Sequence, residues 1–135
     1  LLMLLGALFA PPLLGDWLIV TRTKEIEGGN AIDCGRVDPT QDASPRVACA
    51  KRALSERRPF RIVVDRRGID SNVADGLVLD TNGTSHLLAY DSAPCGNFLC
   101  LPSRREQKCV GAAIDVSPSP FGTGTLVTKI SFQGS

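Results

Sequence analysis

His86 is the only histidine in the 135-residue chain, so it is the first residue to consider for acid–base chemistry near neutral pH. A serine hydrolase would need this ring beside a nucleophilic serine and a carboxylate, and Ser71 with Asp65, Asp70 or Asp91 supplies those residue types. No serine, however, lies in the G-x-S-x-G turn that presents the nucleophile of an α/β hydrolase. His86 also falls within a predicted strand, whereas catalytic side chains are more common on loops. We therefore interpret His86 as a polar strand residue and predict that His86→Gln is tolerated.

Two further patterns are candidates for binding a metal or a nucleotide. Asp80, Asn82 and Thr84 carry oxygen atoms that calcium prefers, but an EF-hand needs more ligands and a closing glutamate. The sequence "FGTGT" has neither the third glycine nor the strand-to-helix context of a dinucleotide site. No pair of carboxylates has a spacing that indicates acid–base work. The sequence thus predicts no catalytic residue, no cofactor and no metal, and the protein is expected not to be an enzyme.

Five cysteines follow the apolar N-terminal segment: Cys34, Cys49, Cys95, Cys100 and Cys109. None forms a C-x-x-C pair, which argues against a zinc ribbon or a thioredoxin-like site. These cysteines favour a disulfide-permissive compartment outside the cytoplasm, which is the periplasm in a Gram-negative host. An odd number fits two bridges and one free thiol, but the spacing leaves the pairing open. Cys95 and Cys100 are candidates for closing a small loop, and Cys34 or Cys109 for linking a segment to the helix that carries Cys49. A metal site with His86 is the weaker alternative.

A basic segment between Lys51 and Arg67 contains only two acidic residues, Glu56 and Asp65. Its arginines form a candidate docking patch: Arg52, Arg57, Arg58, Arg61, Arg66 and Arg67. Beside a bilayer, such a patch would suit anionic headgroups or an acidic protein surface, while the simpler interpretation is a solvated helix face. The net charge of +1 and the aromatic content of 5% argue against a nucleic-acid partner.

The chain opens with "LLMLLGALFAPPLLGDWLIV", in which the first 15 residues carry no charge. Residues 1–24 are predicted to be a membrane anchor and an interfacial segment, because the run resembles a spanning helix more than a cleavable signal. Prolines disfavour helix interiors, so we expect one helix to end near Ala10 and a second to run from Pro12 to Val20. An unremoved signal peptide or a buried core helix is the alternative.

Within the anchor, Gly6, Ala7 and Ala10 form a face of small residues, and small residues allow transmembrane helices to approach closely. Trp17 would then suit the membrane interface, and Arg22 and Lys24 would suit the headgroups.

The remaining chain is predicted to be a linker at 25–43 and an α+β domain at 44–135. Ser44-Pro45 starts a helix that should run to about Arg58, because a capping hydroxyl precedes a proline at the first helical position. Its apolar residues recur at helical spacing.

Strands are expected after this helix. The segment "FRIVVDR" is rich in β-branched residues, and residues 73–91 form two apolar runs around Asn82-Gly83, a pair typical of tight hairpin turns. We expect a loop at 92–105, a strand at 109–116 and a final strand at "TLVTKISFQ". One helix packed on an antiparallel sheet of four or five strands accommodates all these segments.

These features favour a non-catalytic accessory subunit of a larger membrane complex, for example a respiratory or photosynthetic one. It would be a single-pass protein whose domain lies outside the cytoplasm, and its partners would be other membrane-protein subunits and the lipid bilayer. The alternative is a free-standing anchored binding module for a peptide or a small ligand, bound at a sheet edge.

Overall fold

The structure, a computed structural model, describes residues 11–67, 71–94, 101–118 and 125–131. The predictions for Gly6, Ala7, Ala10, Cys95 and Cys100 lie outside these residues. The elements are α2 (Pro11–Glu27), β1 (Ile32–Val37), α3 (Ser44–Ser55), β2 (Phe60–Arg67), β3 (Asn72–Leu79), β4 (Ser85–Asp91), β5 (Ser103–Cys109), β6 (Ala113–Pro118) and β7 (Thr125–Ser131). The α+β class is confirmed. No helix in the described segments is both long enough and apolar enough to cross a bilayer.

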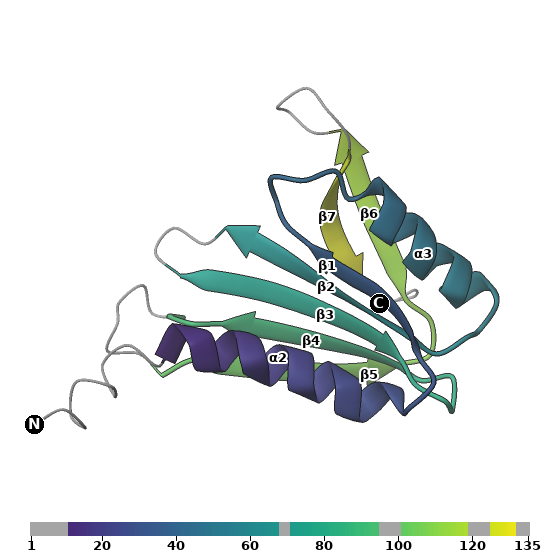
Figure 1. Ribbon diagram of the computed structural model, residues 1–135, viewed down its shortest axis with the longest axis horizontal. Helices are drawn as coiled ribbons and strands as arrows, with labels where there is room; N and C mark the ends of the chain where they lie inside the picture. Colours follow the sequence, from purple (N-terminus) through teal and green to yellow (C-terminus); the bar gives the residue numbers. More distant parts are fainter. Residues whose placement is uncertain (1–10, 68–70, 95–100, 119–124, 132–135) are drawn as a thin grey trace, which may run out of the picture.

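Five strands form one sheet in the order β1-β2-β3-β4-β5, and β6 pairs with β7 in a separate antiparallel hairpin (Figure 1). The pairs β2–β3, β3–β4 and β4–β5 are antiparallel, as predicted, but β1 runs parallel to β2. The sheet is therefore mixed. The reason is that α3 carries the chain back between β1 and β2, and a crossover helix of this kind joins parallel strands.

Helix α2 covers one face of the sheet (Figure 1). Its residues Ile19 and Thr23 are fully buried, and a Cβ atom added at Gly76 of β3 would come within 3.2 Å of the Thr23 side chain. The missing side chain at Gly76 thus lets the helix approach the strand closely. The sequence predicted a helix from Pro12 to Val20 at a membrane interface. In the structure this helix continues to Glu27, and its C-terminal half packs on the sheet.

The main core lies on the opposite face, between the sheet, α3 and the β6–β7 hairpin. Successive strand residues point to opposite faces, so Ile62 and Val64 enter this core while Val63 packs with α2. Helix α3 contributes Val47, Ala50 and Ala53, and the hairpin contributes Ile114 and Ile130, with Ala112 just before it. The helix and the hairpin therefore form one wall of the core together.

Three predicted boundaries differ from the structure. The proposed linker at 25–43 contains the end of α2 and all of β1, because β1 gains its hydrogen bonds from β2, which lies distant in sequence. The proposed loop at 92–105 contains the start of β5, whose polar sequence "SRREQKC" gave no apolar signal because it lies at the sheet edge. The proposed strand at 109–116 is divided between β5 and β6, and residues 110–112 connect them.

The hairpin predicted at Asn82-Gly83 is confirmed between β3 and β4. Gly83 has a φ of 78°, and its amide donates to the Asp80 carbonyl oxygen at 3.1 Å. Asn82 does not share the positive φ, so the left-handed conformation falls on glycine alone. This turn places Asp80 beside His86 and Ser85 at the start of β4.

Candidate functional site

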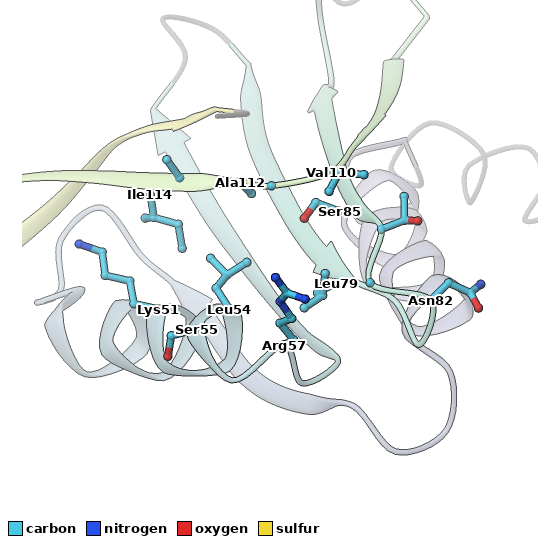
Figure 2. A pocket seen from close by; sticks show the side chains of 14 residues that line it. Lys51, Leu54, Ser55, Arg57, Leu79, Asn82, Ser85, Val110, Ala112 and Ile114 are labelled. Atoms are coloured by element: carbon cyan, nitrogen blue, oxygen red, sulfur yellow. The ribbon is translucent and has the colours of Figure 1, made fainter. Parts of the chain in front are cut away.

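A groove of about 920 Å³ lies between α3, the β3–β4 turn and the start of β6 (Figure 2). Helix α3 lines it with Lys51, Leu54 and Ser55, which are three and four residues apart and so share one face of the helix. Strands and connections supply the opposite wall, including Leu79, the turn at 82–84, Ser85 and residues 110–114. The volume is within the range typical of small-molecule sites.

The charge of the groove has one sign. Among the described residues that line it, Lys51 and Arg57 are the only ionisable side chains, and none is an aspartate or a glutamate. Neither cation forms an ion pair or a side-chain hydrogen bond within the described segments. Both side chains are exposed, and Figure 2 shows them extending from the α3 side of the groove. The lining therefore favours an anionic guest.

Arg57 also has an unusual backbone. It follows the end of α3, has a φ of 54°, and is the only non-glycine residue with positive φ in the part of the chain that the structure describes. Helices commonly end on a glycine in this left-handed conformation, and a residue with a Cβ is less stable there by about 1 kcal/mol. The fold therefore retains a strained arginine at the edge of the groove.

Ser85 is the third unusual residue of the groove. Only 1% of its surface is exposed, and its hydroxyl has no hydrogen-bond partner among the described residues. An unpaired buried hydroxyl destabilises a fold by about 1–3 kcal/mol. Figure 2 shows the side chain pointing from the start of β4 into the space between α3 and Ala112.

His86 belongs to a different cluster, on the α2 face of the sheet. Its side chain is buried between two carboxylates: Nε2 lies 2.8 Å from Asp80 Oδ2, and Nδ1 lies 3.3 Å from Glu106 Oε1. Arg22 of α2 donates to Glu106 at 3.3 Å and to Glu25 at 3.1 Å. The cluster thus connects the β3–β4 turn, β4, β5 and α2. Only an imidazolium ring can donate to both carboxylates at once.

The two carboxylates have lowered pKa values. Burial by itself would raise the pKa of Asp80, but hydrogen bonds from His86 and from the Thr84 and Asn82 amides outweigh it. For Glu106, burial likewise opposes the shift, and hydrogen bonds and charge from His86 and Arg22 hold the pKa below its ordinary value. Both groups are therefore stabilised in the ionised form.

This arrangement predicts acid sensitivity. A carboxyl group whose pKa is lower in the folded than in the unfolded protein stabilises the fold at pH values above its unfolded pKa. This stabilisation is lost as the pH falls through the folded-state pKa. We expect the contribution of Asp80 and Glu106 to the free energy of unfolding, measured in urea, to be constant near neutral pH. It should decrease as the pH falls below 4.5 and then below 3.8, the ordinary pKa values of Glu and Asp.

Asp80→Asn provides the control, and its acid-dependent loss should be smaller. Glu27, whose pKa burial raises, acts with the opposite sign in the same range, so the variant comparison isolates Asp80. An acid profile identical in the two proteins would contradict the assignment.

The His86 side chain is enclosed within its cluster. Both ring nitrogens already have carboxylate neighbours, and only 5% of the residue surface is exposed. Within the described segments, no group of three histidine, cysteine or acidic side chains is placed to hold a metal ion. The interpretation of His86 as a strand residue is confirmed by its place in β4. Its role is to join two carboxylates beneath α2.

The six arginines of the candidate docking patch are distributed over several places. Arg61 is paired on the α2 face with Glu27 at 3.2 Å and with Asp33. Arg66 pairs with Asp75. Arg52, Arg57 and Arg58 are exposed at the C-terminal end of α3, where Arg58 lies 3.5 Å from Glu56, and Arg67 ends β2.

The Arg61 pairing also fixes the charge state of its partners. Burial would raise the pKa of Asp33, but hydrogen bonds from the Arg61 side chain and the Gly35 amide lower it. Burial is stronger for Glu27, whose pKa is raised despite the charge of Arg61. Arg61 therefore serves to hold α2 and β1 against β2.

One of the disulfide alternatives is present. Cys34 of β1 and Cys49 of α3 are bonded, with Cα atoms 5.6 Å apart. Cys109 ends β5, and its side chain is outside the described set. The prediction of a second bridge stays a prediction.

Sequence reasoning missed Ser85 and Glu106, assigned Arg22 to the lipid headgroups rather than to Glu106, and gave Lys51 no separate role. Ser85 had no local signal, since a serine at the start of a strand is ordinary. Arg22 and Glu106 are 84 positions apart, so only the tertiary structure brings them together. The residue with a usable signal was Arg57, because a helix end without glycine before Pro59 suggests a strained terminus.

No family model, curated protein or solved structure matches the chain.

Proposed function

We propose that this chain is a non-catalytic binding domain that works outside the cytoplasm and captures a small ligand in the groove beside α3. The observation that carries the proposal is the groove itself. It is about 920 Å³ in volume, and the two cations in its lining have no ion-pair partner in the described segments. Concave sites of this size with a few convergent polar groups are typical of ligand binding.

The two most unusual groups of the groove support the same proposal. A buried hydroxyl without a partner at Ser85 and a left-handed arginine at Arg57 each destabilise the fold. Features that destabilise a protein are concentrated at functional sites, because elsewhere they confer no advantage. Here both border one groove. The disulfide between Cys34 and Cys49 supports placement outside the cytoplasm, where such bonds persist.

A screen of small soluble fragments, followed by amide NMR shifts, tests the proposal. We expect binding fragments to shift the amides of Leu54, Gly83 and Gly111. Ser55→Trp should abolish these shifts, because an indole on the exposed α3 face of the groove would occupy it.

Ala48→Trp is the matched control, since Ala48 is exposed on the same helix but outside the groove. It should retain binding and stability. If fragments shift these amides equally in Ser55→Trp and the wild type, or if none bind at millimolar concentration, the groove is not a ligand site.

The second candidate is the accessory subunit of a membrane complex that the sequence suggested. The observation that favours it is at β5, which ends the strand order of the sheet and has exposed apolar side chains beyond both ends, Leu101 at 86% and Val110 at 82% exposure. Exposed apolar groups beside a sheet edge suit a protein partner. Purification in mild detergent distinguishes the candidates: stoichiometric co-purifying subunits would support this role, and a monodisperse monomer would count against it.

A further inference from the structure

We propose that the ligand of the groove is a small organic carboxylate with an apolar body, such as a medium-chain acid. The inference rests on the proposed function and deepens it by naming the ligand class. It follows from three independent features of the groove: the sign of its charge, its apolar wall and the buried hydroxyl of Ser85.

The charge selects an anion. Lys51 and Arg57 line the groove without a carboxylate partner in the described segments, whereas Arg61 and Arg66 of the neighbouring strand β2 are paired. An arginine can bind a carboxylate through two parallel hydrogen bonds, and a lysine adds a point charge. A ligand carboxylate would supply the missing negative charge.

The apolar side chains of the groove favour a ligand that has an apolar part as well as a charged group. The apolar surface that the groove exposes comes from half-buried Leu54 and from Val110, which is 82% exposed, while Leu79 and Ile114 of the core lie beneath it. Inorganic anions such as phosphate would leave this surface in contact with water. An aliphatic chain would cover it and gain free energy in proportion to the apolar area removed from water. The volume suits a small molecule rather than a macromolecular surface.

Ser85 supplies a hydrogen-bond donor within this apolar wall. Its hydroxyl is buried and unpartnered, and it points into the groove across from Leu54 (Figure 2). A carboxylate oxygen reaching this depth would accept the hydrogen bond that the hydroxyl lacks. The same hydroxyl would bind an alcohol, so the cations, rather than Ser85, provide the discrimination between an acid and its uncharged analogue.

The test uses the whole chain and three probes of equal length: octanoate, 1-octanol and octyltrimethylammonium. Dissociation constants are measured from the NMR shifts of the groove amides at low salt. Because two cations face the acid group, we expect octanoate to bind about tenfold more tightly than 1-octanol, and octyltrimethylammonium to bind more weakly than either.

Arg57→Gly and Lys51→Gln test the two cations. We expect each to weaken octanoate binding about threefold, so that the two together account for the tenfold preference, and to leave 1-octanol binding unchanged. Arg57→Gly should also raise the melting temperature by about 3 °C, because glycine relieves the left-handed strain. A loss of binding in this variant therefore cannot come from unfolding. Arg52→Gln is the matched control, since Arg52 is exposed on α3 outside the groove, and it should leave octanoate affinity unchanged.

The outcomes separate this inference from the proposed function. Equal affinity for octanoate and 1-octanol at the groove amides would overturn the carboxylate assignment and leave a ligand-binding groove. Equal weakening by Arg52→Gln would mean diffuse charge attraction and would also overturn it. If no octyl probe binds, the ligand class is wrong, and the fragment screen with Ser55→Trp decides separately whether the groove binds ligands at all.

Discussion

Replacing His86 with leucine is expected to lower the free energy of unfolding by about 3 kcal/mol. The ring lies between Asp80 and Glu106, with 7% of its side chain exposed, and the two acidic side chains are only 15% and 19% exposed. Leucine would leave both carboxylates without their shared partner, and unpaired charges in a low-dielectric site are strongly destabilising. Urea unfolding at pH 6 measures the change directly.

Two further variants make the interpretation specific. His86→Gln retains an amide donor for one carboxylate, so its loss should be about half that of leucine. This revises the sequence-based expectation that glutamine is tolerated, because the structure shows a buried side chain with two acidic neighbours. Asp80→Asn combined with His86→Leu should cost less than the sum of the two single losses, since the double variant removes one unpaired charge. If the loss in the double variant equals the sum of the two single losses, Asp80 and His86 do not interact as the structure indicates.

Removing the Cys34–Cys49 disulfide is expected to lower the free energy of unfolding by a similar amount, about 3 kcal/mol. The bond closes a loop over a sequence separation of 15 residues and joins β1 to the crossover helix α3. Without it, the unfolded chain gains conformational freedom, and β1 depends on β2 alone for its position. Cys34→Ala/Cys49→Ala is the suitable variant because serine would introduce a hydroxyl at the buried Cys34 position.

Reduction of the wild-type protein with dithiothreitol should reproduce most of this loss, and the same treatment should have little effect on the double variant. Mass spectrometry of unreduced, alkylated protein should find Cys34 and Cys49 unlabelled. If both residues are labelled in the native protein, they are free thiols. The disulfide and the argument for an oxidising compartment would then be wrong.

The secondary structure after residue 44 was largely predictable, and the reasons are local. Helix α3 starts at Ser44-Pro45, β2 is a run of β-branched residues, and Gly83 permits the turn between β3 and β4. Each signal depends on backbone dihedrals or on periodicity within a few residues. Two strands were not predicted correctly because no local pattern indicates them. Strand β1 is identified only by its pairing with β2, and β5 is a polar edge strand.

The candidate sites depended on contacts that no local pattern contains. Cys49 was expected to bond with either Cys34 or Cys109, and only the approach of β1 to α3 selects Cys34. The basic segment looked continuous in sequence, yet Arg61 faces α2 while Arg57 lines the groove. Arg57 lies in the connection that follows α3, whereas Arg61 lies on β2 and points to the sheet face that α2 covers, so the fold separates charges that are close in sequence.

By itself, the sequence determined the α+β class, the helix at Ser44, the Gly83 hairpin and the presence of cysteines suited to disulfides, because these depend on propensities and spacings along the chain. The tertiary structure alone decided the groove and the buried histidine cluster. It placed Ser85 beneath a groove with Lys51 and Arg57, and it enclosed His86 between Asp80 and Glu106 under α2. The physical reason is burial: a serine, a lysine or a histidine is ordinary in water, and its energy and chemistry change only when distant segments remove the water around it.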